Sequence, residues 1–326
     1  MLSVINGKNT FRRMVSQREA ANRFPELTRA VWTKSDALFP VRITRSWFGR
    51  VLSATGPLGL QSFPHPQELE HDDGDLNDPV GEMNLSPVKW VIQKHPDRAL
   101  LIVTRRCHLY CRYCFRRTTP HNEDPTVEEM CNAINYLRTS GVNEVILSGG
   151  DPLFLKDRRL FNIIDELYRF VNIVRIHTRA VITSPDRVTN SFVERISKYK
   201  GLWLILHINH SNELCDEVCA KISGLKESGV SLLNQSVLLR GVNDDAKILA
   251  CLSQRLLSLG VFPYYLHHPD NVTGNVSFRV SIDEGLKIYE QLSKSISGIA
   301  LPRYVIDPPD GTGKIDVKDY WRNCGS

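Results

Sequence analysis

Short apolar runs alternate with helical patterns from Arg98 onward, and this alternation limits the possible folds more than any other feature. Each run has the length of a strand and is followed by a segment with helical spacing. Strands separated by helices form parallel, right-handed βα units. We therefore predict an α/β fold in which six parallel strands curl into a partial (β/α)6 barrel, formed by the runs ALLIVT, NEVILSGG, IVRIHTRAVI, LWLILHINH, VSLLNQSVLL and FPYYLHH.

The segments on either side of this alternation predict three parts. Residues 1–92 form a helical and irregular N-terminal extension, residues 93–305 the core, and residues 306–326 a short C-terminal tail. A net charge of +5 with interspersed signs does not indicate nucleic-acid binding. No run of 18 apolar residues and no secretory signal occur, so we expect a cytoplasmic protein without membrane attachment.

Three cysteines follow the first predicted strand in the segment TRRCHLYCRYCFRR. In a reducing compartment, the spacing Cys-x3-Cys-x2-Cys indicates a metal or redox site before disulfides. The thiolates of Cys107, Cys111 and Cys114 can hold a 4Fe-4S cluster and leave one iron without a protein ligand. That iron can chelate the amino and carboxylate groups of another molecule. The alternative is a zinc site completed by His108.

The remaining cysteines give weaker signals. Cys131 and Cys251 lie in helical apolar patterns, where we expect buried, inert thiols. Cys215 and Cys219 are spaced for one turn of a helix but have no second pair, so we interpret them as structural.

A lysine near the C-terminus is preceded by glycines in RYVIDPPDGTGKIDV. Alone, this segment is typical of a glycine-rich turn before a surface lysine. Beside a metal cluster, Lys314 can instead hold pyridoxal phosphate as a Schiff base and bind an amine substrate.

The cysteine segment resembles the radical S-adenosylmethionine superfamily. In that superfamily the aromatic residue before the third cysteine, here Tyr113, packs near the adenine. A GGE-like element after the second strand contacts the amino group of the methionine, and SGGDPL occupies that place here. The resemblance therefore implies that Ser148, Gly149, Gly150 and Asp151 contact S-adenosylmethionine.

A more specific resemblance is to the lysine 2,3-aminomutase family. It runs from about Pro79 to Val317 and rests on CHLYCRYCFRR, SGGDPL, LHINHSNE, LLNQSVLLRGVND, PYYLHHPDNV and IDPPDGTGK. It implies an isomerase in which a 5′-deoxyadenosyl radical takes hydrogen from carbon 3 of a lysine bound to pyridoxal phosphate. The α-amino group then moves to carbon 3. A flavodoxin-like or ferredoxin-like electron donor and a homo-oligomer are further expectations.

The resemblance also implies roles for single residues. Arg116 pairs with the substrate carboxylate, Asp270 and Asp307 with the distant ammonium, and Gln235 lies near S-adenosylmethionine. Lys314 is the pyridoxal lysine.

Three more residues match phosphate neighbours in the family. Lys94 and His95 replace an arginine and a tyrosine there, whereas Arg98 is retained; a surface charge is the alternative for each. We interpret His207 and His210 as core or supporting histidines before metal ligands.

Two features leave the substrate open. Twelve residues follow Lys314, and Cys324 is the only cysteine among them, so we do not expect the zinc site that the resemblance to free-lysine enzymes would imply. FPVRITRSWFGRV resembles a compact branch that acts on a lysyl residue of translation elongation factor P, whereas VIDPPDGTGK resembles the free-lysine enzymes. We favour the hypothesis that free L-lysine is the substrate, and the lysyl residue of elongation factor P is the alternative. A non-catalytic iron-sulfur protein is the remaining alternative, but it explains neither Lys314 nor the paired aspartates.

Overall fold

The computed structural model describes residues 14–324. Within them nine strands form one sheet in chain order. Strands β2 to β8 are parallel, and the edge strands β1 and β9 pair antiparallel with their neighbours. The strands are β1 (Val91–His95), β2 (Arg98–Thr104), β3 (Glu144–Gly149), β4 (Ile173–Thr178), β5 (Leu202–His207), β6 (Ser231–Val237), β7 (Phe262–His267), β8 (Arg303–Ile306) and β9 (Ile315–Asp316).

The predicted partial barrel is confirmed, with differences in its strands. The sheet is open, because β1 and β9 do not pair with each other in the described chain. It has one more parallel strand than the six predicted. The additional strand, β8, arises from RYVI, a run too short to be separated from a loop by periodicity. The run IVRIHTRAVI divides, since β4 ends at Thr178 and a helix begins at Ala180.

Helices connect the strands and precede them. The α-helices are α1 (Gln17–Arg23), α2 (Arg29–Leu38), α3 (Arg45–Arg50), α4 (Pro57–Leu60), α5 (Val127–Thr139), α6 (Asp157–Leu167), α7 (Ala180–Thr183), α8 (Asn190–Ile196), α9 (Asp216–Glu227), α10 (Ala246–Ser258), α11 (Ile282–Ser295) and α12 (Val317–Cys324). The 3-10 helices are η2 (Pro66–Leu69), η3 (Met83–Leu85), η4 (Pro152–Phe154), η5 (Pro185–Arg187), η6 (Ser211–Glu213), η7 (Val276–Phe278) and η8 (Gly298–Ala300).

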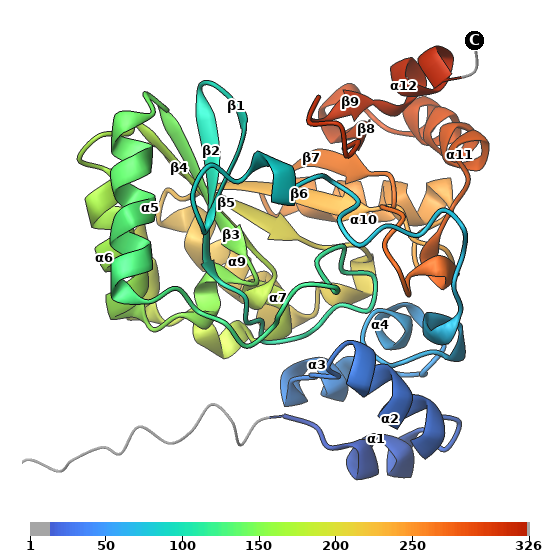
Figure 1. Ribbon diagram of the computed structural model, residues 1–326. Helices are drawn as coiled ribbons and strands as arrows, with labels where there is room; N and C mark the ends of the chain where they lie inside the picture. The colour runs from blue at the N-terminus through green and yellow to red at the C-terminus, as the bar shows by residue number, and fades with distance from the viewer. Residues whose placement is uncertain (1–13, 325–326) are drawn as a thin grey trace, which may run out of the picture.

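Helix α5 shows how the sequence specifies these helices. Thr126 and Glu129 form a capping box, which satisfies backbone N–H groups at the helix start. The buried residues recur at helical spacing and form one apolar face: Met130, Ala133, Ile134 and Leu137. Figure 1 shows α5 beside α6 along the outer side of the sheet.

The expectation that Cys131 and Cys251 are buried is wrong, because both are exposed. Cys131 follows Met130 of the apolar face of α5 and is therefore turned about 100° away from it. The apolar pattern predicts the position of the helix in the sequence, but it does not predict whether each cysteine in that helix is buried.

A buried charge cluster attaches the N-terminal helices to the core. The Glu68 carboxylate of η2 pairs with Arg112 and with Arg117, at 2.9 Å for the latter, and the Glu68 and Arg112 side chains are fully buried. Figure 1 shows α1 to α4 gathered at one end of the molecule and α11 and α12 at the other. The extension is thus fixed at the loop that carries the three clustered cysteines.

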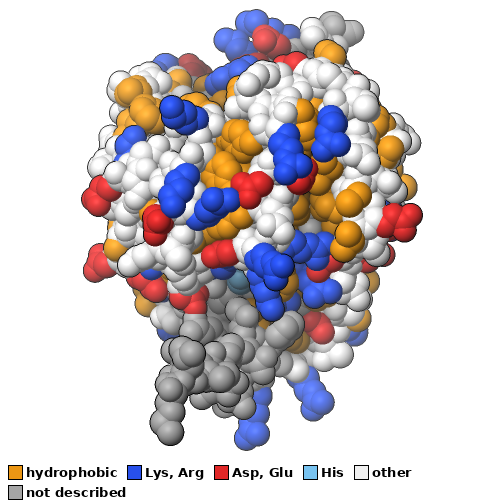
Figure 2. Space-filling view, turned by 90° about the vertical axis from the view of Figure 1, so that its left-hand side faces the viewer, with side chains coloured by type: hydrophobic (Ala, Val, Ile, Leu, Met, Phe, Trp, Pro, Cys, Tyr) orange, Lys and Arg blue, Asp and Glu red, His pale blue; other side chains and the backbone are white. Residues whose placement is uncertain are grey.

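The surface mixes charges of both signs. Figure 2 shows one face on which Lys and Arg side chains lie among Asp and Glu. Among residues 14–324, no helix has the length and apolar character needed to cross a membrane.

Candidate active site

One face of the curled sheet carries polar side chains. Along β4 and β6, fully buried residues alternate with half-buried ones, so successive side chains point to opposite faces. His177 and Gln235 lie on the half-buried face, and the Gln235 amide nitrogen is 3.4 Å from Nδ1 of His177. The Nε2 atom of His177 is buried and has no hydrogen-bond partner. A ligand with an acceptor atom fits this orphaned group.

The three clustered cysteines share a cavity. Cys107, Cys111 and Cys114 line it together with Arg116 and the two glycines at the end of β3. Burial raises the pKa of the Cys107 thiol and raises that of Cys114 to about 11. Metal binding must therefore supply the energy to remove these protons. In the described chain, no three His, Cys, Asp or Glu side chains converge on a single-ion site. A four-iron cluster is larger than one ion and fits thiols spread around a cavity.

A network of buried polar side chains contacts the cysteine loop. Arg179, directly after β4, donates to Sγ of Cys111 at 2.8 Å and to the buried Glu213 carboxylate at 2.9 Å. Burial opposes the charge of Arg179, but the neighbouring thiol, phenol and carboxylate groups outweigh it and raise its pKa. Sequence reasoning missed both residues, since their signal is a polar side chain next to a buried strand end.

Tyr113 is held by histidine and asparagine side chains. Its hydroxyl lies 2.8 Å from Nε2 of His207 and accepts a hydrogen bond from Asn209 at 2.7 Å. The Tyr113 and His207 rings are stacked, with centroids 5.7 Å apart. His210 serves locally instead, since its ring accepts a hydrogen bond from the backbone of Asn212.

The SGGD segment packs against the start of the cysteine loop. Gly149 has φ +114°, and a Cβ there would lie 2.5 Å from the Thr104 carbonyl oxygen. The Asp151 carboxylate accepts hydrogen bonds from the Leu153 N–H at 3.0 Å, the Thr178 hydroxyl at 2.7 Å and the Arg179 N–H at 2.8 Å. Close backbone packing thus requires glycine at these positions. Contact of this segment with S-adenosylmethionine stays a prediction.

Lys314 lies in a cluster of charged side chains that includes Asp307 and Lys94. The Asp307 carboxylate accepts from Lys314 at 3.0 Å and from Lys94 at 2.8 Å. Lys94 also donates to the Val80 carbonyl at 2.7 Å. Burial opposes ionisation of Asp307, but the two ammonium groups outweigh it and lower its pKa.

Asp270 belongs to the same cluster. Burial, followed by the charge of Asp307, raises its pKa to about 7, while Lys314 and Lys94 act in the opposite direction and Glu82 adds to the rise. The charges of Asp307, Lys314, Lys94 and Glu82 therefore all influence the Asp270 carboxyl group. The structure brings the predicted Lys314, Asp270 and Asp307 together.

The predicted phosphate neighbours are placed differently from one another. Lys94 is bound to Asp307, as above. His95 lies against Gly313, close to Lys314 in the chain, whereas Arg98 pairs with the exposed Asp97 at 3.0 Å. An accessible amine with cationic and imidazole neighbours fits pyridoxal phosphate.

Arg116 already has a carboxylate partner. Its Nε donates to Glu82 at 2.7 Å, and its Nη2 pairs with the other oxygen of the same carboxylate. Its Nη1 donates to the Gly149 carbonyl at 3.0 Å. Burial lowers the pKa of Arg116, but Glu82 outweighs it and the pKa is raised. Sequence reasoning missed Glu82, because nothing local distinguishes it from other acidic residues of the extension.

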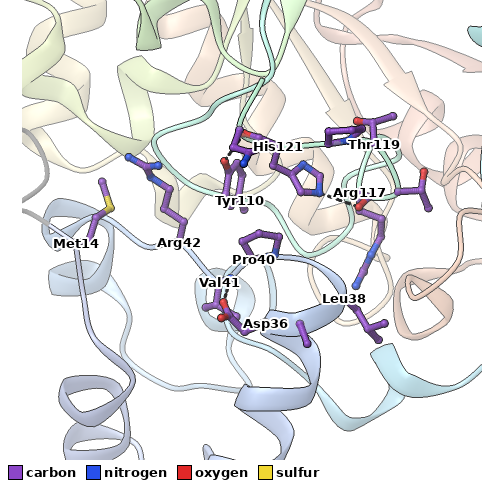
Figure 3. A pocket seen from close by; sticks show the side chains of 14 residues that line it. Met14, Asp36, Leu38, Pro40, Val41, Arg42, Tyr110, Arg117, Thr119 and His121 are labelled. Atoms are coloured by element: carbon purple, nitrogen blue, oxygen red, sulfur yellow. Dashed lines mark hydrogen bonds between the residues drawn. The ribbon is translucent and has the colours of Figure 1, made fainter. Parts of the chain in front are cut away.

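A second hollow lies outside this site. Its volume is about 740 Å³, and Figure 3 shows it between the 36–42 segment and the 110–122 loop. Tyr110, Thr119 and His121 line both this hollow and the cysteine cavity. None of the predicted site residues lines it.

Comparisons with known proteins identify the family of this chain. The model of the Radical SAM superfamily matches residues 101–250. An L-lysine 2,3-aminomutase of Buchnera aphidicola is 39% identical over 287 residues, which span 86% of this chain and 84% of that protein. A glutamate 2,3-aminomutase of Clostridioides difficile is 37% identical over 266 residues, covering 79% and 62%.

A solved structure shows the same fold. SuiB of Streptococcus suis, bound to S-adenosylmethionine, has a TM-score of 0.51 at 17% identity and covers 65% of this chain and 51% of its own. The Radical SAM match implies a 4Fe-4S cluster and S-adenosylmethionine as cofactors. Together with the extent of the Buchnera match, these findings show that the chain is an isomerase that belongs to the lysine 2,3-aminomutase family of radical S-adenosylmethionine enzymes.

Proposed function

We propose that this enzyme moves the α-amino group of L-lysine to carbon 3 and forms β-lysine. Cys107, Cys111 and Cys114 would hold the cluster, and Lys314 would hold pyridoxal phosphate. Family membership supports the class of reaction. The charged side chains around Lys314 support L-lysine as the substrate.

The carboxylate of Asp270 carries this proposal. Among the described residues it has no hydrogen-bond or ion-pair partner, whereas Asp307 has two ammonium partners. A half-buried carboxylate without a protein partner remains open to a cation, and a substrate ammonium would supply one. The side-chain carboxylate of glutamate would be repelled at the same place, which favours a lysine substrate over glutamate.

The residues of this chain would bind and orient the reactants. When bound, S-adenosylmethionine on the cluster supplies a carbon radical and pyridoxal phosphate an electron sink. Asp270 would hold the ε-ammonium of the substrate, which limits movement of the reacting carbon chain. Lys94 would keep Asp307 paired once the Lys314 amine is engaged by the cofactor. The free N–H of His177 would hydrogen-bond an acceptor in the opening.

The second candidate is the same chemistry on a lysyl residue of elongation factor P. The Glu82–Arg116 pair favours it, because this arginine is neutralised without a substrate carboxylate. A nitrogen can migrate only from a free α-amine, so such a substrate would be linked through its carboxyl group.

An anaerobic assay would test the proposal with three substrates offered side by side: L-lysine, L-glutamate and elongation factor P that carries a carboxyl-linked lysyl group. Mass spectrometry should detect β-lysine from L-lysine and no product from L-glutamate. Reaction of the factor together with inert free lysine would replace the preferred substrate by the second candidate.

The cluster assignment has its own test. Cys111→Ala should lose bound iron and S-adenosylmethionine cleavage, because two thiolates hold a four-iron cluster poorly. The exposed Cys251→Ala is the matched control and should retain both. Normal iron content in Cys111→Ala would contradict the ligand set.

A further inference from the structure

His177 carries a buried ring N–H group without a protein partner. Its Nδ1 atom lies 3.4 Å from the amide nitrogen of Gln235, which can only donate, so Nδ1 accepts this hydrogen bond. The hydrogen of the neutral ring is therefore on Nε2. Nothing in residues 14–324 accepts a hydrogen bond from Nε2, although this atom is shielded from solvent. A buried donor of this kind marks the place of a ligand atom.

The ring lies on the polar face of the curled sheet, close to Lys314. His177 belongs to the half-buried set of β4, which alternates with the fully buried set. Burial lowers the pKa of His177 most, and four neighbours lower it further: Arg175, Lys314, His267 and Arg116. The ring is therefore neutral at physiological pH, and the cysteine loop and the segment after β8 both bring a cation near it.

The cations around the ring already have carboxylate partners. The pairs are Arg175 with Glu144, Arg116 with Glu82, and Lys314 with Asp307. The largest charge effects on the ring nevertheless all come from basic groups. The region in front of Nε2 therefore suits an oxygen that carries negative charge, because the N–H group and the cations both stabilise it.

Pyridoxal phosphate has such an oxygen beside the carbon that reacts with a lysine. Its ring hydroxyl and its phosphate arm flank that carbon on opposite sides, and the hydroxyl ionises readily. The residues predicted to contact the phosphate, His95 and Arg98, lie on β1 and β2, whereas His177 lies on β4 with β3 between them. A phosphate on the β1 side of Lys314 leaves the ring oxygen on the side of His177.

We propose that His177 is a cofactor-binding residue, whose Nε2–H group donates a hydrogen bond to the ring oxygen of pyridoxal phosphate held on Lys314. Gln235 is a positioning residue for this contact, because it fixes the tautomer of the ring. The inference rests on the proposed function and adds a residue that the family resemblance did not supply. The hydrogen bond stabilises the ionised oxygen and so lowers the pKa of the proton that this oxygen shares with the Schiff-base nitrogen.

Two polar substitutions at one position test the contact. In His177→Gln the side-chain amide reaches roughly the position of Nε2, whereas in His177→Asn it reaches only that of Nδ1 and keeps the contact with Gln235. The pKa of the Lys314 Schiff base is read by absorbance between pH 6 and 10, as the difference between cluster-loaded enzyme with and without pyridoxal phosphate. It should rise by about one unit in His177→Asn and stay near the wild-type value in His177→Gln.

An exposed histidine supplies the control. His71 is 72% exposed and lies 3.9 Å from Asp75, so His71→Asn should leave the Schiff-base pKa unchanged. The other titratable and charged groups around the site are shared by all variants and cancel in the comparison: Arg116, Arg175, His267, Lys94, Asp307 and Asp270.

Two results would overturn the inference. One is a Schiff-base pKa that rises equally in both His177 variants. The other is an unchanged pKa in His177→Asn, and weaker binding of S-adenosylmethionine by that variant would then assign the N–H group to an oxygen of that ligand. A wild-type enzyme without a borohydride-fixable adduct at Lys314 would overturn the proposed function and this inference with it. A normal adduct on an enzyme that leaves L-lysine unchanged would contradict the proposed substrate alone.

Discussion

The chemistry of Asp270 depends strongly on its surroundings. Its pKa is raised to about 7, first by burial and then by Asp307, so it ionises near neutral pH. A raised pKa means that the folded protein binds the proton more tightly than the unfolded chain does. The folded state therefore loses stability as pH rises from about 4 to 7, and the carboxylate becomes able to bind a cation over the same range.

The first prediction is a pH dependence of substrate binding. Below pH 7, the dissociation constant for L-lysine should rise up to about tenfold per pH unit, because Asp270 becomes neutral. Calorimetric titration between pH 5.5 and 8.5 would measure it. Asp270→Asn should bind weakly at every pH and lose this dependence, and thermal unfolding at pH 8 should show it more stable than the wild type. An identical pH profile in the variant would assign the titration to another group.

The second prediction concerns Lys314 and its neighbour Lys94. Lys314→Ala should retain the cluster but lose the pyridoxal adduct that borohydride fixes, because alanine has no amine to form the Schiff base. Peptide mass spectrometry would locate the adduct. Lys94→Met is the matched control and should still carry the adduct at Lys314. An adduct at Lys94 in the wild type would move the attachment site.

At the scale of elements, residues 77–85, which we call the cap turn, meet the segment after β8 through backbone contact. Gly81 has φ +68°, and a Cβ there would lie 2.2 Å from the Pro309 carbonyl oxygen. Only glycine allows this approach, since the neighbour is backbone and cannot rotate away. The close contact positions Glu82 and Lys314 relative to each other.

The third prediction follows from this contact. Gly81→Ala should displace the cap turn, lower the melting temperature and weaken pyridoxal phosphate binding measured by absorbance. Gly141→Ala is the control, because Gly141 has φ +74° and a Cβ added there would meet no described atom within 4 Å. Both variants share the cost of a positive φ, roughly 1 kcal/mol. Equal effects of the two would show that the Pro309 contact contributes nothing.

At the scale of the whole molecule, Glu68 couples the N-terminal extension to the core. Its carboxylate is the shared partner of Arg112 and Arg117, which flank Cys114. Loss of one member of a buried ion pair leaves the others desolvated and typically costs about 3–5 kcal/mol. The extension and the cysteine loop therefore stabilise each other.

The fourth prediction tests this coupling. Glu68→Gln should lower the melting temperature by roughly 10 °C and reduce the iron content after reconstitution. Glu19→Gln removes the partner of Arg45 in an exposed ion pair and should have little effect on either. If Glu68→Gln is less stable but still binds a normal amount of iron, the cysteine loop does not depend on the extension and the coupling is contradicted.

Local patterns in the sequence determined the class of fold, the cysteine motif and most strand positions, because strand period, helix capping and short ligand spacings depend on residues close together in the chain. The division into three parts and the roles of single residues stay predictions. Tertiary structure alone decided the exposed face of Cys131 and the additional strand β8. It also decided which charges pair: Lys94 meets Asp307 across 213 residues, and Glu82 meets Arg116. Ion pairs form between groups brought together by packing, and local sequence carries no record of those distances.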